Sequence, residues 1–264
     1  MDITTPPPKN LLTFAPREFR GSRFRCLLLT STPPQDTAEF LTQVAHPFAT
    51  VTASDIWAPK GFGDPDEIEL HNASRFPFTS ERKALDQWWL AVPRGERPNW
   101  DLVSTCVFDN RPGLMLVEAK SHVAELGEKD QSGAAGENKQ SIEKAFVEAN
   151  TSLQASTSKG WNLGFAPHYQ LSNRFAFAWK MAQQGVPVVL VYLGFTNAIE
   201  MQEKRTLFSS HGDWERRVRD YSRGVVPDDC WGVQINVPDV SGKTTPMVAL
   251  IRSMDVRITA SAIQ

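Results

Sequence analysis

The apolar run at residues 186–195, VPVVLVYLGF, constrains the fold more than any other feature of the sequence. It is about half as long as the roughly 20 residues that a membrane-spanning helix needs. Its valines and aromatic residues are typical of strands, and it is apolar on both faces. Such a strand has to be covered by other elements on both sides. The run therefore predicts the central strand of an α/β protein, and it predicts no membrane span.

Helical and strand patterns precede this run in a definite order. Residues 80–92 and 169–184 carry apolar side chains at helical spacing. Between them, residues 100–108 and 114–121 alternate strand-forming residues around Asp-Asn-Arg-Pro-Gly, a turn sequence typical of a β-hairpin. The predicted core, residues 80–195, is therefore a helix, a hairpin, a second helix and the apolar strand.

Further segments lie outside this core. A polar, Gly-rich interval followed by a helix at residues 137–155 makes residues 127–168 an insertion. An acid and three prolines near the start predict a partly disordered lead-in over residues 1–22. The other predicted elements are a strand at 24–30, a helix from 36 or 37 to 46, a basic helix at 212–223, and strands at 232–237 and 247–252. No linker interrupts the pattern, so residues 1–264 are expected to form one domain.

The charge and the cysteine content exclude several classes of protein. Lys and Arg number 28 against 30 Asp and Glu, which gives a net charge of −2. This balance excludes a polycation but not a nucleic-acid-binding protein, because binding depends on where the cations gather. The three cysteines are widely spaced without a Cys-x-x-Cys motif, which argues against a disulfide framework or a structural zinc site. A reducing cytoplasm is the expected location.

The tripeptide Glu-x-Lys occurs three times, starting at Glu81, Glu118 and Glu137. The first and third copies lie on predicted helices, where residues two apart point to different sides. Only Glu118 and Lys120 lie on a predicted strand, where they share a face. On its own such a pair is usually a solvated strand end. Neighbouring residues therefore decide whether this pair belongs to a functional site.

An aspartate joins this pair through the predicted hairpin register. Folding the hairpin at residues 110–113 pairs Asp109 with Leu114, so that paired residue numbers add up to 223. Asp101 then lies opposite His122 and shares a sheet face with the Glu-x-Lys pair, within reach of its side chains. Asp109 falls about 13 Å from Glu118 along the strand, and we expect it to be a turn residue.

Two carboxylates and a lysine that converge at one end of a hairpin predict a cation site. The like charges of Asp101 and Glu118 repel each other unless a counter-ion lies between them. Hard oxygen ligands suit Mg²⁺, for which Mn²⁺ is a substitute. Lys120 can then orient a water or stabilise the charge that develops on a phosphate. This combination is suited to hydrolysis of a phosphodiester bond.

The segments Asn99-Trp100-Asp101-Leu102-Val103 and Leu116-Val117-Glu118-Ala119-Lys120-Ser121 resemble the PD-(D/E)xK nuclease superfamily, which includes restriction endonucleases and Holliday-junction resolvases. The resemblance implies a restriction endonuclease-like α-β-β-β-α-β core with N-terminal, inserted helical and C-terminal additions. It implies that Asp101 and Glu118 bind the metal with the Ala119 carbonyl, and that Lys120 is the catalytic lysine. Two features depart from the family pattern. Trp100 replaces the proline, and no separate strand is evident between the first helix and Asp101.

The resemblance adds weaker candidates. Many members add a glutamate from the first helix, and Glu81 falls on the inward stripe of residues 80–92, although a first-turn acid also suits the helix dipole. Gln170 corresponds to a glutamine that touches the site in exonuclease-like members, and Asn173 is a weaker candidate. His122 faces the right way, but polar packing or a phosphate contact is the expected role.

Arginines on the late basic helix are the candidate nucleic-acid contacts. They are Arg216, Arg217 and Arg219, and a solvated helix face is the competing interpretation. We therefore expect a metal-dependent nuclease that acts on DNA in preference to RNA. The alternative is a catalytically inactive nucleic-acid-binding or scaffold protein of the same fold. A homodimer is compatible with the sequence.

Overall fold

The structure, a computed structural model, describes residues 20–93, 95, 97–127 and 130–256. Its helices in these ranges are α1 (Gly21–Thr30), α2 (Pro34–Ala45), α3 (Thr79–Trp89), α4 (Gly136–Thr157), α5 (Tyr169–Gln183) and α6 (His211–Ser222). The strands are β1 (Ala49–Thr50), β2 (Trp57–Ala58), β3 (Ile68–Glu69), β4 (Asn99–Trp100), β5 (Leu102–Phe108), β6 (Arg111–Lys120), β7 (Val188–Thr196), β8 (Gln234–Pro238) and β9 (Thr244–Asp255). Short 3-10 helices connect several of them, including η5 (Val123–Leu126) and η6 (Ile199–Met201).

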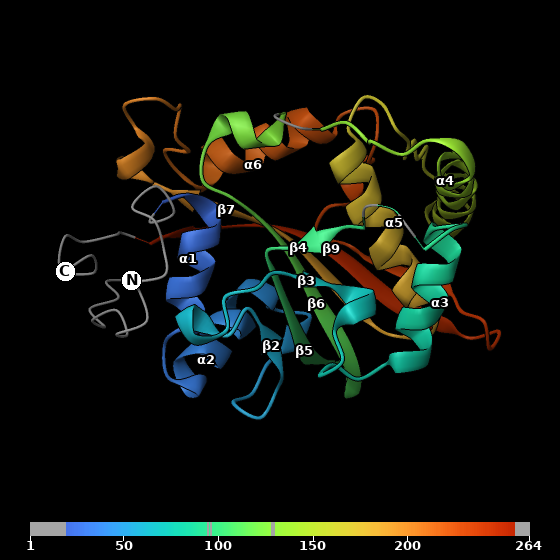
Figure 1. The fold of residues 1–264 in the computed structure, drawn as a ribbon, viewed down its shortest axis with the longest axis horizontal. Helices are drawn as coiled ribbons and strands as arrows, with labels where there is room; N and C mark the ends of the chain where they lie inside the picture. Colours follow the sequence, from blue (N-terminus) through green and yellow to red (C-terminus); the bar gives the residue numbers. More distant parts are fainter. Residues whose placement is uncertain (1–19, 94, 96, 128–129, 257–264) are drawn as a thin grey trace.

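The fold is mixed α/β and is built on one mixed sheet of seven strands (Figure 1). The strand order is β1-β5-β6-β7-β9-β8, and β2 also pairs with β5. β5 and β6 form an antiparallel hairpin, whereas β6, β7 and β9 run parallel to one another. β3 and β4 form a separate antiparallel pair.

Helices cover both faces of this sheet (Figure 1). One hydrophobic cluster joins one face to α3, α4, α5 and α6, and the other joins the opposite face to α1 and α2. Along β6, Leu114 and Leu116 enter the first cluster, while Met115 and Val117 enter the second. This is the period of two that side chains follow along a strand. Glu118 and Lys120 therefore belong to the face that α5 covers.

Most of the predicted elements are confirmed. β7 is buried at every position, as expected of the apolar run. α3, α4, α5 and α6 correspond to the four predicted helices of the core, the insertion and the C-terminal third, and α2 to the predicted helix near residue 46. β8 and β9 match the two late strands. Among the described residues, no helix has both the length and the apolar character needed to cross a membrane.

The strand predicted at residues 24–30 is wrong, because this segment lies within α1. α1 is buried on almost all sides and contacts α2 and β6, so its apolar residues show no amphipathic stripe. A short apolar run that is buried all round cannot be assigned to strand or helix by periodicity alone. Within it, Arg25 is buried and donates to Glu200 of η6 at 2.5 and 2.8 Å. The predicted lead-in lies outside the described residues up to residue 19, and α1 already begins at Gly21.

The hairpin register differs from the predicted one. Phe108 pairs with Arg111 and Leu102 with Val117, so paired residue numbers add up to 219 and not 223. The turn is a tight one, because Asp109 and Asn110 adopt φ of 46° and 60°, the left-handed conformation that two-residue hairpin turns use. The shift is an even number of residues, so each side chain stays on its predicted face. Directly before Asp101 the chain forms β4, which pairs with β3 and not with a strand of the seven-stranded sheet.

Candidate functional site

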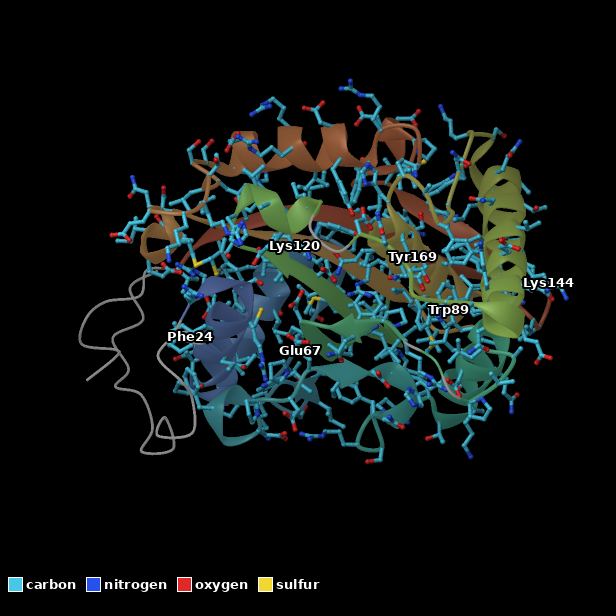
Figure 2. All side chains as sticks on the ribbon, turned by 45° about the horizontal axis from the view of Figure 1, so that its top comes forward. Phe24, Glu67, Trp89, Lys120, Lys144 and Tyr169 are labelled. Carbon is cyan, nitrogen blue, oxygen red and sulfur yellow. The ribbon has the colours of Figure 1, made fainter. Side chains whose placement is uncertain are left out.

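A cavity of 650 Å³ opens where β6 ends beside the start of α5. Lys120 and Tyr169 at its edge lie near the middle of the molecule (Figure 2). The side chains around it are mostly polar or charged. They include Glu67, Arg97, Asn99, Asp101, Glu118, Lys120, His122, Glu125, Gln131, Gln170, Asn173 and Arg174. Such a concentration of charge in a concave site is typical of functional sites.

Glu118 is the most buried carboxylate of the cavity, with 1% of its surface exposed. Lys120 Nζ donates to its Oε1, and Arg174 Nε donates to its Oε2 at 2.5 Å. Burial alone would raise the pKa of Glu118, but these two cations outweigh it and hold the pKa below its usual range. Glu118 is therefore a buried carboxylate anion between two cations.

Asp101 occupies the short bend between β4 and β5. Its Oδ2 accepts a hydrogen bond of 2.7 Å from the Ala119 N–H, which ties this bend to the end of β6. Oδ1 makes no hydrogen bond to any described residue. Burial, and then the nearby charge of Glu118, raise the pKa of Asp101 well above its usual range. A cation that approaches Asp101 would therefore stabilise the ionised form of its carboxyl group.

Lys120 connects the strand end to α5. Its Nζ donates to Gln170 Oε1 at 3.1 Å as well as to Glu118. Burial would lower the pKa of Lys120, but the carboxylates of Glu118 and Asp101 reverse this effect and raise it. Lys120 is therefore an ammonium group, which donates hydrogen bonds and cannot accept a proton.

A second buried carboxylate, Asp130, fixes the start of α5. Asp130 Oδ1 accepts from the Gln170 N–H at 2.6 Å, and Oδ2 lies 2.8 Å from both His168 Nδ1 and Tyr221 Oη. An acceptor at the first turn of a helix satisfies an N–H group that has no partner within the helix. Asp130 thus joins α5 to α6, which carries Tyr221, and holds Gln170 beside Lys120.

The structure brings most of the predicted site residues together. Asp101, Glu118, Ala119, Lys120, His122, Gln170 and Asn173 all line the cavity. His122 is buried, and its Nε2 lies 3.6 Å from Glu125 Oε1, as expected for polar packing. Glu81 does not line the cavity, and its hydrogen bond is to the neighbouring Ser80 near the surface. Asp109 is a turn residue, as expected.

The predicted nucleic-acid contacts lie on α6 and already have acidic partners. Arg216 and Arg217 both pair with Asp213, and Arg219 pairs with Glu215 and Asp228. Such pairs are typical of a solvated helix face. Neither Arg216, Arg217 nor Arg219 lines the cavity at the end of β6.

Several residues in or beside the cavity were missed from the sequence, among them Glu67, Asp130 and Arg174. Glu67 lies just before β3, far from the other site residues along the chain. It lines the cavity, and its Oε2 accepts a hydrogen bond of 2.8 Å from Asn99 Nδ2. Asp130 lies in the insertion, where no pattern marks it. Arg174 could have been found, because it follows Gln170 by four residues and so shares its helix face.

Comparison with known proteins gave no match to any family model, curated protein or solved structure. Within the described ranges, no three side chains of His, Cys, Asp or Glu are arranged as a metal-binding group. The geometry of the cavity at the end of β6 is therefore the basis for any functional argument.

Proposed function

We propose that this protein is a metal-dependent nuclease that hydrolyses phosphodiester bonds, in DNA in preference to RNA, with Asp101, Glu118 and Lys120 as its catalytic group. One observation carries the proposal. Two carboxylates and an ammonium group meet in an open cavity at the end of the hairpin, with a further polar contact from Gln170. The other charged clusters of the described chain lack this combination of paired carboxylates, lysine and an accessible cavity.

The donor atoms of this cavity suit Mg²⁺ or Mn²⁺. Carboxylate oxygens from Asp101 and Glu118 are hard ligands, and Ala119 lines the same cavity between them. Asp101 Oδ1 has no hydrogen-bond partner among the described residues, while the charge of Glu118 is already balanced by cationic side chains. The residues that would hold the ion are thus Asp101 and Glu118, assisted by the Ala119 carbonyl.

Lys120 supports the reaction as a hydrogen-bond donor. A bound divalent ion would polarise the phosphate and lower the pKa of an attacking water. Lys120 remains protonated because its pKa is raised, so it stabilises the charge that develops on the phosphate oxygens instead of removing a proton. Gln170, fixed by Asp130, limits the positions that the Lys120 ammonium can adopt.

The order of elements supports membership of the PD-(D/E)xK superfamily. α3, the β5–β6 hairpin, α5 and β7 follow each other as in the restriction endonuclease-like core, and the hairpin carries the acidic residues and the lysine. The parallel pairing of β6 with β7 is also compatible with that core.

Purified protein incubated with plasmid, single-stranded DNA or RNA tests the proposal. We expect cleavage with Mg²⁺ or Mn²⁺ and none with EDTA, and we expect DNA to be the better substrate. The matched variants are Asp101→Asn and Lys120→Ala, which should both lose cleavage, whereas only Lys120→Ala should still bind the cation. Cleavage that persists in both variants would mean that a contaminating nuclease or another site is responsible.

The alternative is a nucleic-acid-binding or scaffold protein without turnover. The ion pairs that already neutralise Glu118 favour this alternative, because they stabilise the cavity without a metal. It predicts binding of nucleic acid without cleavage in any cation. The incubation described above separates the two functions.

A further inference from the structure

We propose that Arg174 is an internal counter-ion that neutralises Glu118 while no divalent cation is bound, and that it opposes cation binding. This inference rests on the proposed function, because it takes Glu118 as a metal ligand. Arg174 is not among the residues that the nuclease pattern marks. Its role follows from its contacts and from the burial of its partner.

The guanidinium of Arg174 is held by more than its ion pair. Nη2 donates to the Asn99 carbonyl at 2.7 Å, and Nη1 donates to Asn173 Oδ1 at 3.0 Å. The group also lies over the ring of Trp100, at 4.7 Å from the ring centroid. Arg174 can therefore lose its hydrogen bond to Glu118 and keep its position. Only the contact with Glu118 depends on the state of that carboxylate.

Burial makes such a counter-ion necessary. Glu118 is almost fully buried, and an isolated buried carboxylate is strongly destabilising. Arg174 and Lys120 remove this cost when no metal is present. A divalent cation that binds Glu118 replaces their effect, and it is repelled by the charge of Arg174 at short range. The same residue thus stabilises the metal-free protein and weakens its affinity for the cation.

The variant Arg174→Gln tests this role through cation affinity. In a calorimetric titration with Mn²⁺ alone, we expect the variant to bind about tenfold more tightly or better than the parental protein, since a full charge is removed a few ångströms from the site. Its metal-free form should melt at a lower temperature, and the rise in melting temperature with Mn²⁺ should be larger. A purely structural role predicts the opposite change in affinity, because damage to the cavity weakens ligand binding.

Two further variants serve as controls. Lys180 is a matched residue, because it is a buried cation on the same helix and lies over the ring of Trp88, at 5.1 Å, outside the cavity. Lys180→Gln should leave the Mn²⁺ affinity unchanged. Arg174→Lys keeps the charge and should leave the affinity within about threefold of the parental value. Equal or weaker Mn²⁺ binding by Arg174→Gln would overturn the inference.

A measurement on the parental protein covers the case in which Arg174→Gln does not fold. The nuclear magnetic resonance signal of Arg174 Nε–H, assigned with Arg174→Lys, should shift when Mg²⁺ is added, because its hydrogen bond to Glu118 weakens. An unaltered signal at saturating Mg²⁺ would refute the inference. If the parental protein binds neither Mg²⁺ nor Mn²⁺, the proposed nuclease function itself fails.

Discussion

At the scale of single residues, the candidate site is a cluster of buried charges whose members depend on one another. Glu118 accepts from both Lys120 and Arg174, so each cation has the same carboxylate as a partner. Removal of one member of a buried ion pair leaves the others uncompensated. Glu118, Lys120 and Arg174 therefore also stabilise the fold. A substitution of any of them is expected to change the free energy of unfolding as well as the proposed activity.

Glu118→Gln should be strongly destabilising. The substitution removes the negative charge and leaves two buried cations without it, so we expect the free energy of unfolding to fall by about 3–5 kcal/mol. Urea denaturation of the metal-free protein measures this change. Glu143 lies on the exposed side of α4, and Glu143→Gln should change the stability by less than about 0.5 kcal/mol. A loss in Glu118→Gln no larger than in Glu143→Gln would show that Glu118 is not held in this ion-pair cluster.

Asp101→Asn, in contrast to Glu118→Gln, should stabilise the metal-free protein. The pKa of Asp101 is raised in the folded protein, so its contribution favours the fold below the pKa of the unfolded chain and is lost as the pH rises through the folded pKa. An asparagine keeps an acceptor for the Ala119 N–H and does not ionise. The metal-free variant should therefore melt at a higher temperature than the parental protein at neutral pH, with a difference that disappears in acid.

Thermal melts from acid to neutral pH, with EDTA and with Mg²⁺, test this expectation for Asp101. Mg²⁺ should raise the melting temperature of the parental protein more than that of Asp101→Asn, because the variant has lost a charged ligand. A difference between the two proteins that does not change with pH would contradict a raised pKa at this position.

At the scale of elements, Asp130 connects the segment after β6 to α5 and α6. It accepts hydrogen bonds from the backbone at the start of α5 and from Tyr221 on α6. The contact between Gln170 and Lys120 depends on this arrangement. Lys120 is thus linked through Gln170 to an acid outside the motif that carries it.

Asp130→Ala should loosen the start of α5. It leaves the Gln170 N–H and the Tyr221 hydroxyl without their buried acceptor, which we expect to lower the free energy of unfolding by about 1–3 kcal/mol. Hydrogen exchange at Gln170 should become faster, while the strands β6 and β7 keep their protection. The surface variant Asp229→Asn, which affects only the exposed pair with Lys159, is the control and should leave both quantities unchanged. Unchanged exchange at Gln170 would show that Asp130 does not fix this helix start.

At the scale of the whole molecule, electrostatics place a condition on nucleic-acid binding. The chain carries a net charge of −2, and the described residues around the cavity include four carboxylates and three side chains of Lys or Arg. The arginines of α6 are paired with acids of their own helix or with Asp228. A polyanion therefore meets no strongly positive surface at the site unless a divalent cation is bound.

We accordingly expect binding of nucleic acid to depend on the cation. The Lys120→Ala variant, which should not cleave, is suited to this measurement with a short DNA strand. Its affinity should fall by about tenfold or more when Mg²⁺ is replaced by EDTA at constant ionic strength. Equal affinity in both conditions would mean that the DNA binds elsewhere on the surface.

The arginines of α6 are tested in the same assay. Replacing Arg216 and Arg217 together by Gln should leave the dependence of the affinity on salt nearly unchanged, since Asp213 already balances them. A flatter salt dependence would show that α6 contacts the phosphate backbone after all.

The sequence by itself determined most of the local elements and the sheet face on which Glu118 and Lys120 lie. The apolar run, the helical spacings and the turn-rich Asp-Asn-Arg-Pro-Gly segment are local patterns, and they were sufficient to predict the strand, the helices and the hairpin, although the turn lies at Asp109 and Asn110 and not at residues 110–113. Glu118 and Lys120 lie on their predicted face despite the wrong register, because side chains on a strand alternate with a period of two and the error was even. The helix α1 was misjudged, since burial on all sides removes the periodicity that would mark it.

Only the tertiary structure decided which partners complete the site. Arg174 and Glu67 line the cavity from segments that are far from the hairpin in the chain, and Asp130, in a segment without a recognisable pattern, bonds to the backbone of the cavity residue Gln170. The pKa shifts of Asp101 and Glu118 differ in direction because one is buried near a like charge and the other between two cations. Burial and charge proximity are properties of the packed molecule, and a one-dimensional pattern does not contain them.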